Sequence, residues 1–231
     1  MVELQEHQLS RALTLMGYTR KILEKQSDGA DQALIDAYYV LGPPHGVHGI
    51  PRVRLVDVDE TGIWLACIRR RYGHAPKGAK AGTKAPYNVG KKYSAIIAID
   101  IHGVVAYQVM DVKGTTSVIW YHFVNDILLP AIRAPHGELH VPRLILMDNL
   151  AAHHNRATLE LIAAAGHGHT FRPPRASIEL GSIEYAMNVL KCDLRQHWPL
   201  IDENNLLHFV EDAICRMTAR QCVEFFHHTG H

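Results

Sequence analysis

The sequence predicts an α/β protein built on one mixed β-sheet with helices on its faces, and two regions of different pattern indicate this. Residues 53–110 hold apolar runs rich in β-branched side chains and bounded by turn signals, which is typical of antiparallel strands. Residues 114–217 alternate segments of helical period with short, wholly apolar runs, as in parallel strands joined by crossover helices. We therefore expect three leading antiparallel strands followed by parallel strands.

The leading strands are predicted from short apolar runs. We expect a strand over 53–58, with Asp59 at its end and Gly62 in a turn. A second apolar run covers 63–68. After a basic insertion, two more apolar runs flank the tripeptide Ile-His-Gly, so residues 93–110 predict a β-hairpin.

The second half supplies the crossover units. Residues 142–148 are apolar on both faces, which predicts a buried parallel strand. Helical period predicts helices on either side of this strand, and a last short strand is stopped by two prolines. In order, the expected elements are a helix over 114–132, the strand over 142–148, a helix over 155–166, a strand over 168–174 and helical regions over 182–198 and 206–217.

The N-terminal part has a different composition. Residues 1–40 are polar with apolar side chains at helical spacing, and residues 42–51 contain three prolines and three glycines. Such a cluster of chain-breaking residues indicates a linker. We expect an N-terminal helical remnant and linker over 1–48 and one α/β domain over 49–231.

The composition is that of an ordinary globular protein, with 47% hydrophobic and 20% charged residues. No apolar stretch approaches the roughly 18 to 20 residues that span a bilayer, so no membrane partner is expected. The first residues lack the basic and apolar regions of a signal peptide. The four cysteines form no C-x-x-C pair, which argues against a zinc ribbon.

The charge is unevenly distributed although the net charge is only +1. The segment from residue 69 to residue 92 has eight basic side chains and no acidic one. Such a block is the electrostatic footprint of a nucleic-acid contact, and a solvated, glycine-rich loop is the alternative. The predicted nucleic-acid-binding residues are Arg69, Arg70, Arg71, Lys77, Lys80, Lys84, Lys91 and Lys92.

Three carboxylates lie at the ends of predicted elements that this architecture brings together. Asp59 follows the first strand, Asp148 follows the parallel strand expected beside it, and Glu184 lies in the first turn of the helix after the last strand. Carboxylate oxygens suit hard cations such as Mg²⁺ or Mn²⁺, and a pair of such ions serves in-line phosphoryl transfer. Asp148 is the expected bridging ligand.

Neighbouring polar residues offer alternatives. Asp57 competes with Asp59 because both point the same way in an extended strand, but we expect Asp57 to be a flanking surface charge and Glu60 to be solvated. The adjacent His153 and His154 leave a zinc site open. Adjacent side chains on a helix point about 100° apart, so only one of these two histidines could join Asp148.

Several motifs around these positions resemble those of mariner-like DDE transposases. The stretches "VDVDETG" and "YGHAPKG" are similar to the family's Asp-Glu-Ser/Thr-Gly and Gly-x-Ala-Pro-x-Gly elements. "LMDNLAAHH" is similar to its Asp-Asn-x-x-x-His motif, and "IELGSIEYAMNVLKCDLR" to its third motif. The spacing of 35 residues between Asp148 and Glu184 and the closing "FFHHTGH" also fit the family. The first motif favours Asp59 over Asp57.

The resemblance implies an RNase H-like catalytic core. In it, Asp59, Asp148 and Glu184 would be catalytic and would hold two Mg²⁺ (or Mn²⁺) ions that serve cleavage of transposon-end DNA and joining to target DNA. Asn149 and His153 would lie beside the metal ligands without being ligands. The implied partners are DNA and a second copy of the chain, and the implied location is the nucleus, or the cytoplasm of a prokaryote.

Two departures from the family pattern carry expectations of their own. Before Ile183 and Glu184, Gly181 and Ser182 replace the usual Asn-Pro, so the helix that carries Glu184 is expected to begin more loosely. Only some forty residues precede the linker, whereas family members usually carry two helix-turn-helix modules there, which suggests truncation. The alternative function is a catalytically inactive or host-adopted remnant that binds only DNA or protein.

Overall fold

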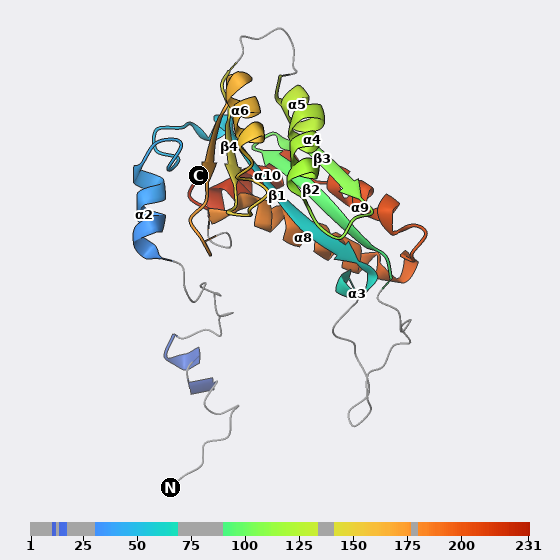
Figure 1. Ribbon diagram of the computed structural model, residues 1–231. Coiled ribbons are helices and arrows are strands. Elements are labelled where there is room, and N and C mark those ends of the chain that lie inside the picture. The colour runs from blue at the N-terminus through green and yellow to red at the C-terminus, as the bar shows by residue number, and fades with distance from the viewer. Residues whose placement is uncertain (1–10, 13, 18–30, 69–89, 134–140, 177–179) are drawn as a thin grey trace.

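A five-stranded mixed sheet lies at the centre of the molecule and has helices on both faces (Figure 1). The computed structural model describes residues 11–12, 14–17, 31–68, 90–133, 141–176 and 180–231. The strand order is β3-β2-β1-β4-β5. The strands are β1 (Leu55–Trp64), β2 (Lys92–Asp100), β3 (Gly103–Met110), β4 (Leu144–Met147) and β5 (Gly168–Phe171).

The directions of the strands confirm the predicted fold class. β1, β2 and β3 are joined by antiparallel pairing, whereas β4 and β5 continue the sheet from β1 by parallel pairing. The connections between the parallel strands run through helices, as expected for crossover units.

The end of the first strand was wrongly predicted. β1 does not stop at Asp59 but continues to Trp64, because β2 pairs with it residue by residue from Asp57 to Trp64. Gly62 therefore lies opposite Ser94 within the ladder and not in a turn. The apolar run over 63–68 divides between the end of β1 and the short helix α3 (Leu65–Ile68), since a short apolar run by itself does not distinguish strand from helix.

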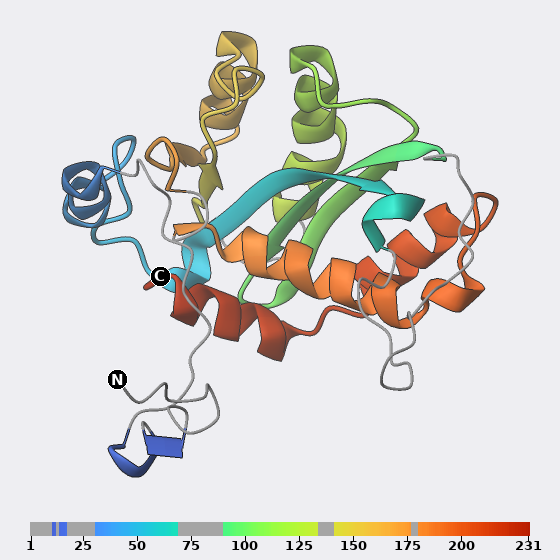
Figure 2. The same ribbon diagram turned by 90° about the horizontal axis from the view of Figure 1, so that it is seen from below.

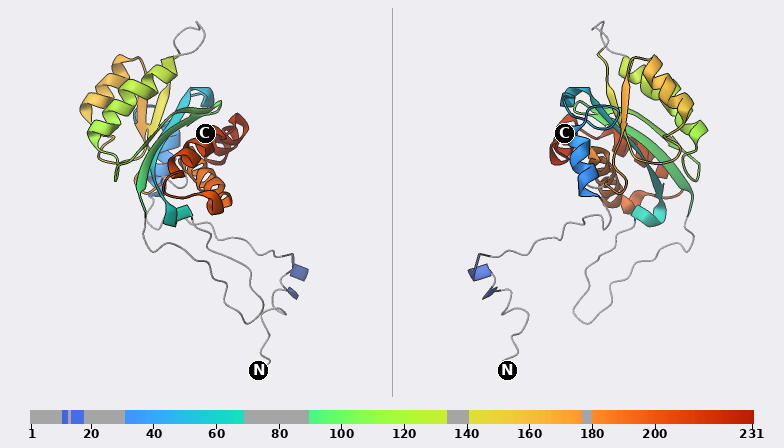
Figure 3. Two further views of the ribbon diagram at one scale, coloured as in Figure 1. Left: turned by 90° about the vertical axis from the view of Figure 1, so that its right-hand side faces the viewer. Right: turned by 60° about the vertical axis from the view of Figure 1, so that its left-hand side comes forward.

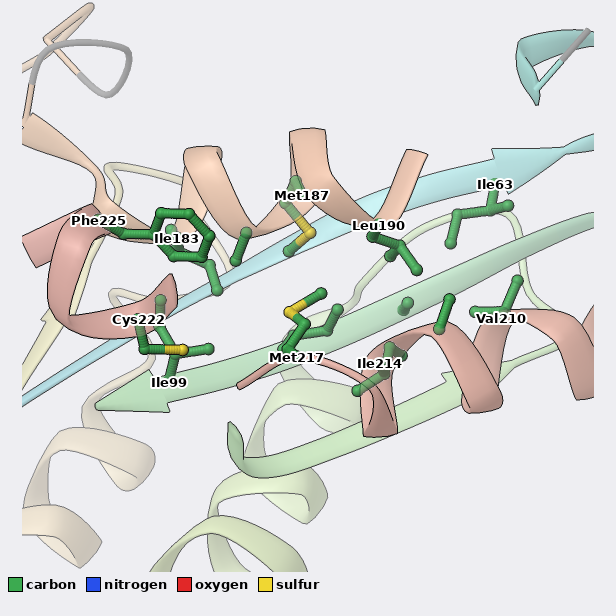
Figure 4. Close-up of a cluster of buried hydrophobic side chains, with 14 of the residues drawn as sticks. Ile63, Ile99, Ile183, Met187, Leu190, Val210, Ile214, Met217, Cys222 and Phe225 are labelled. Atoms are coloured by element: carbon green, nitrogen blue, oxygen red, sulfur yellow. The ribbon is translucent and has the colours of Figure 1, made fainter. Parts of the chain in front are cut away.

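Three helices cover one face of the sheet: α8 (Ser182–Gln196), α9 (Leu206–Cys215) and α10 (Ala219–His228). Figure 4 shows their apolar side chains interleaved with those of the strands, including Ile183 and Leu190 of α8 and Ile63 and Ile99 of the sheet. The final helical region predicted over 206–217 corresponds to α9, and α10, which was not predicted, follows after a break over 216–218.

The opposite face carries a second helical layer. One continuous helical segment consists of α4 (Ser117–His122), the π-helical η2 (Phe123–Leu128) and α5 (Leu129–Arg133), and α6 (Arg156–Ala164) lies beside it. Viewed from below or edge-on, the sheet separates this layer from α8, α9 and α10 (Figures 2 and 3). Thr116 caps α4 through its side chain, as its position before the helix favours.

Helix α2 (Gln32–Val40) packs beside the last described residues of the chain. Its Tyr38 is buried in the core below α8, and the hydroxyl of Tyr39 donates a hydrogen bond to the carbonyl of Thr229. The rings of both tyrosines contact His231. The domain boundary near residue 48 stays a prediction, but α2 shares its core with the sheet.

Two short 3₁₀ segments, η1 (Arg52–Arg54) and η3 (Trp198–Leu200), are also present. Within the part of the chain that the structure describes, no helix has the length and apolar character needed to cross a membrane.

Candidate functional site

The sheet register brings Asp59 and Asp148 to neighbouring positions. β1 and β4 pair in parallel as far as Asp57 and Leu146, so Asp59, two residues further along β1, and Asp148, directly after β4, follow the same end of this pairing. Along β1, Leu55 packs in the core under α8, whereas Val56 and Val58 pack on the other face. Because side chains alternate along a strand, Asp59 points toward the α8 face.

Glu184 reaches the same region from the opposite direction. It lies in the first turn of α8, as predicted, and α8 packs across β1. Thus a position in β1, the residue after β4 and the first turn of α8, three segments far apart in the sequence, supply the three predicted carboxylates.

The charges of Asp148 and Glu184 act on Asp59, and the charge of Asp148 also acts on Glu184. Burial raises the pKa of Asp59 to about 7; Arg172 opposes this shift, while the charges of Asp148 and Glu184 add to it. Burial likewise raises the pKa of Glu184 against the opposing Arg172 and Lys191, with Asp148 again contributing to the rise. The site therefore concentrates negative charge that a cation would neutralise.

The donor atoms and the negative charge of these three residues suit a divalent metal ion. The oxygen donors of Asp59, Asp148 and Glu184 are those that Mg²⁺ and Mn²⁺ prefer. Across the described residues, however, no three His, Cys, Asp or Glu side chains converge closely enough to form a ready-made metal cage. Asp59 instead accepts hydrogen bonds from the backbone N–H of Glu60 (2.7 Å) and from Arg172 (3.3 Å).

A buried histidine holds Asp148. The His153 ring is fully buried against Trp120, with its Nδ1 2.6 Å from Asp148 Oδ1 and its Nε2 3.1 Å from Glu60 Oε2. Burial alone would lower the pKa of His153, but the two carboxylates raise it to about 9. Despite its own partial burial, the pKa of Asp148 is lowered by His153 and by the backbone N–H of Leu150. Glu60, expected to be solvated, is instead the second partner of His153.

The free energy of unfolding of the wild type should decrease as pH rises through about 9, and we expect substitution of His153 by glutamine to make this decrease smaller. A pKa raised above the unfolded value of about 6.5 stabilises the folded state below that pH, and this contribution is lost as pH rises through about 9. For the wild type, the loss due to His153 between pH 7.5 and 9.5 is about 2 kcal/mol. Urea denaturation at both pH values measures it. The neighbouring exposed His154→Gln serves as control and should keep the wild-type pH dependence.

The two adjacent histidines have separate surroundings. His154 stacks on Phe171 with ring centroids 4.0 Å apart, and its Nε2 lies 3.2 Å from Asn149 Oδ1. Asn149 in turn donates a side-chain hydrogen bond to the carbonyl of Arg172. Thus Asn149 and His153 both adjoin Asp148, and His154 and His153 do not face a common centre.

Sequence reasoning missed two buried residues of this site. Asp57, expected at the surface, is fully buried and forms an ion pair with Arg172, which is itself fully buried. The alternation that places Asp57 on the same strand face as Asp59 was the available signal. Arg172 follows the last strand directly, and nothing in its local sequence marks it as a partner of β1.

Most of the predicted nucleic-acid-binding residues lie outside the described part of the chain, namely Arg69, Arg70, Arg71, Lys77, Lys80 and Lys84. Lys91 forms an exposed ion pair with Asp111 (3.5 Å). The Lys92 ammonium lies 5.4 Å from the centre of the Trp64 ring, within cation–π range.

Comparison with known proteins agrees with the fold and the motifs. A family model described as DDE superfamily endonuclease matches residues 54–207. No curated protein matches the chain significantly.

The structure of the Mos1 mariner paired end complex with Mn superposes with a TM-score of 0.67 at 16% identity, covering 97% of this chain and 68% of that chain. The Mos1 transposase catalytic domain with Raltegravir and Mg superposes with a TM-score of 0.56 at 14% identity, covering 99% and 92%. The predicted RNase H-like fold and the resemblance to mariner-like DDE transposases are confirmed.

Proposed function

Because the chain belongs to the DDE superfamily of endonucleases, we propose that it is a transposase core that cleaves and joins DNA phosphodiester bonds with divalent metal ions. The observation that carries the proposal is the joint placement of the carboxylates. Support comes from the parallel pairing of β1 with β4, the strand that precedes Asp148, from the packing of α8 with Glu184 in its first turn across β1, and from the charges of Asp148 and Glu184, which both raise the pKa of Asp59.

Asp59, Asp148 and Glu184 would hold two Mg²⁺ or Mn²⁺ ions, which when bound activate the attacking oxygen and stabilise the leaving 3′ oxygen. The protein's own part is to align these carboxylates and to oppose the effect of burial on the charges of Asp59 and Asp148. His153 keeps Asp148 ionised and fixes one of its oxygens. Arg172 opposes protonation of Asp59 and fixes the orientation of its carboxyl group.

The proposed partners are DNA and a second copy of the chain. Among the matching structures are a Mos1 transposase paired-end complex with a left transposon end and a Mos1 strand transfer complex. By this likeness we propose transposon ends and target DNA as the substrates, and a dimer as the active assembly.

The direct test is metal-dependent cleavage of duplex DNA by the purified protein. We expect nicks with 3′-hydroxyl ends in Mg²⁺ and in Mn²⁺, and none in EDTA. A supercoiled plasmid provides a sensitive substrate because a single nick relaxes it. Absence of product in both metals, with a folded protein that still binds DNA, would count against the proposal.

DNA binding by the basic segment should show in its salt dependence. Replacing Lys77, Lys80 and Lys84 together by alanine should reduce the slope of log affinity against log salt by about 0.9 per lost phosphate contact, or ~2.7 in all. Fluorescence anisotropy with a labelled duplex over a range of salt concentrations measures this slope. The double variant Arg156→Ala and Arg220→Ala is the control, since each of these exposed arginines pairs with a glutamate of its own helix. An unchanged slope in the triple variant would remove the segment from the DNA interface.

A further inference from the structure

The buried pair of Asp57 and Arg172 lies at the point where the three carboxylate-bearing segments meet. The Arg172 guanidinium donates from one terminal nitrogen to Asp57 and from the other to Asp59, the latter over 3.3 Å. Both members of the pair are fully buried. One planar side chain thus bridges two carboxylates on the same face of β1, which a guanidinium can do through its fixed fork of donors.

The backbone of Arg172 contacts the segment that carries Asp148. Its N–H donates to the carbonyl of Met147 (2.8 Å), and its carbonyl accepts from the side chain of Asn149. Met147 and Asn149 are the two chain neighbours of Asp148. The position of Asp148 is therefore tied on both sides to the residue that holds Asp59.

The other member of the pair contacts the segment that carries Glu184. The second oxygen of Asp57 accepts a hydrogen bond from the backbone N–H of Ile183 (3.0 Å), the residue before Glu184. Helix α8 begins after Gly181, which offers no side-chain cap. Asp57 thus satisfies a first-turn N–H of this helix from a neighbouring strand, at the place where the family's usual Asn-Pro is absent.

We propose that Asp57 and Arg172 are positioning residues that set Asp59, Asp148 and Glu184 in the relative places that metal binding requires. This inference rests on the proposed function. It assigns to the pair a role beyond neutralising each other's buried charge, because each contact ends on a catalytic carboxylate or on a residue next to one in the chain.

The variant Arg172→Lys separates positioning from charge. Lysine keeps the positive charge, so the electrostatic effect on a nearby metal ion is retained, but its single ammonium cannot reproduce the two-pronged bridge between Asp57 and Asp59. We expect Mn²⁺ affinity of the full chain, measured by calorimetry and by the electron paramagnetic resonance of free Mn²⁺, to fall at least tenfold. In the metal-free protein, amide hydrogen exchange at Ile183 should become faster.

The matched control is Arg143→Lys. Arg143 forms a less buried ion pair with Asp100 (3.4 Å), and no contact joins it to any of the three carboxylates. Its substitution should leave Mn²⁺ affinity within threefold of the wild type. If Arg172→Lys does not fold, as judged by circular dichroism and melting, the same titration is made on Asp57→Asn, which keeps the size of the side chain and an acceptor oxygen.

The outcomes are distinct. Affinity lost tenfold or more in a folded variant, with the control unchanged, supports the positioning role. The positioning role is overturned if the affinity falls by less than tenfold, if the control loses as much affinity, or if both variants fail to fold. The pair would then serve only the stability of the fold. A wild-type protein that binds no Mn²⁺ overturns the proposed function, and this inference with it.

Discussion

Replacing Arg172 by methionine is expected to lower the free energy of unfolding by about 3–5 kcal/mol, which is the usual effect of breaking a buried ion pair from one side. The reason is that Asp57 would remain fully buried without its counter-ion. Methionine has a similar length and fills most of the space, so the loss reflects uncompensated charge more than a cavity. Denaturation by urea in metal-free buffer at neutral pH measures it.

A second substitution tests this explanation. In the double variant Asp57→Asn with Arg172→Met, the unpaired charge is gone, so about 1–3 kcal/mol should be recovered relative to Arg172→Met alone. The exposed Arg156→Met, which breaks only a surface pair with Glu160, should change stability by about 0.5 kcal/mol or less. Equal stability of the single and double Arg172 variants would show that the ion pair is not the cause.

The sequence was sufficient to predict features that depend on local pattern. The wholly apolar run before Asp148 predicted a buried parallel strand, and β4 is that strand. The helical region predicted over 182–198 is α8, and Ile183, Met187, Leu190 and Leu194, which recur in it at helical spacing, are all buried. Such periodicities are set by backbone geometry and can be recognised without knowing the partner element.

Features that depend on a distant partner were not predictable in this way. β1 continues past Asp59 because β2 supplies a pairing partner as far as Trp64, and no residue near Gly62 signals this. Asp57 is buried because Arg172, 115 positions later, neutralises it. An aspartate in an exposed strand and an aspartate with a buried counter-ion look alike in one sequence, since the difference in free energy comes from the partner.

The altered third motif does not by itself indicate loss of the site. The sequence lacks the usual residues before Ile183 and Glu184, which predicted a looser start for α8. In the structure, the carboxylate of Asp57 in β1 accepts a hydrogen bond from the backbone N–H of Ile183. The contact from Asp57 in β1 thus compensates for the changed residues at the start of α8. The Asp57–Arg172 pair is therefore more important here than in a chain that keeps the usual Asn-Pro.

Replacing Asp148 by alanine should reduce metal-dependent DNA cleavage by about 10³-fold or more. Loss of a carboxylate that helps to hold the metal ions removes several kcal/mol of transition-state stabilisation, and each 1.36 kcal/mol is a factor of ten in rate. Single-turnover cleavage of a labelled duplex in Mn²⁺ gives the rate. Asp126→Ala is the control, because Asp126 is an exposed aspartate on the helical layer of the opposite face, and its rate should match the wild type.

Asp148→Ala must also be shown to fold, because His153 loses a buried partner when Asp148 becomes alanine. Asp148→Asn keeps an acceptor oxygen for His153 and should be as inactive as the alanine variant while melting closer to the wild type. Equal cleavage by wild type and both Asp148 variants would assign the activity to a contaminating nuclease. Absence of cleavage in all of them, with DNA binding intact, would favour a remnant that binds DNA without cutting it. Only activity that depends on both the metal and Asp148 identifies Asp59, Asp148 and Glu184 as a working catalytic centre, because a folded Asp148→Asn protein keeps the acceptor for His153 but loses a charged metal ligand.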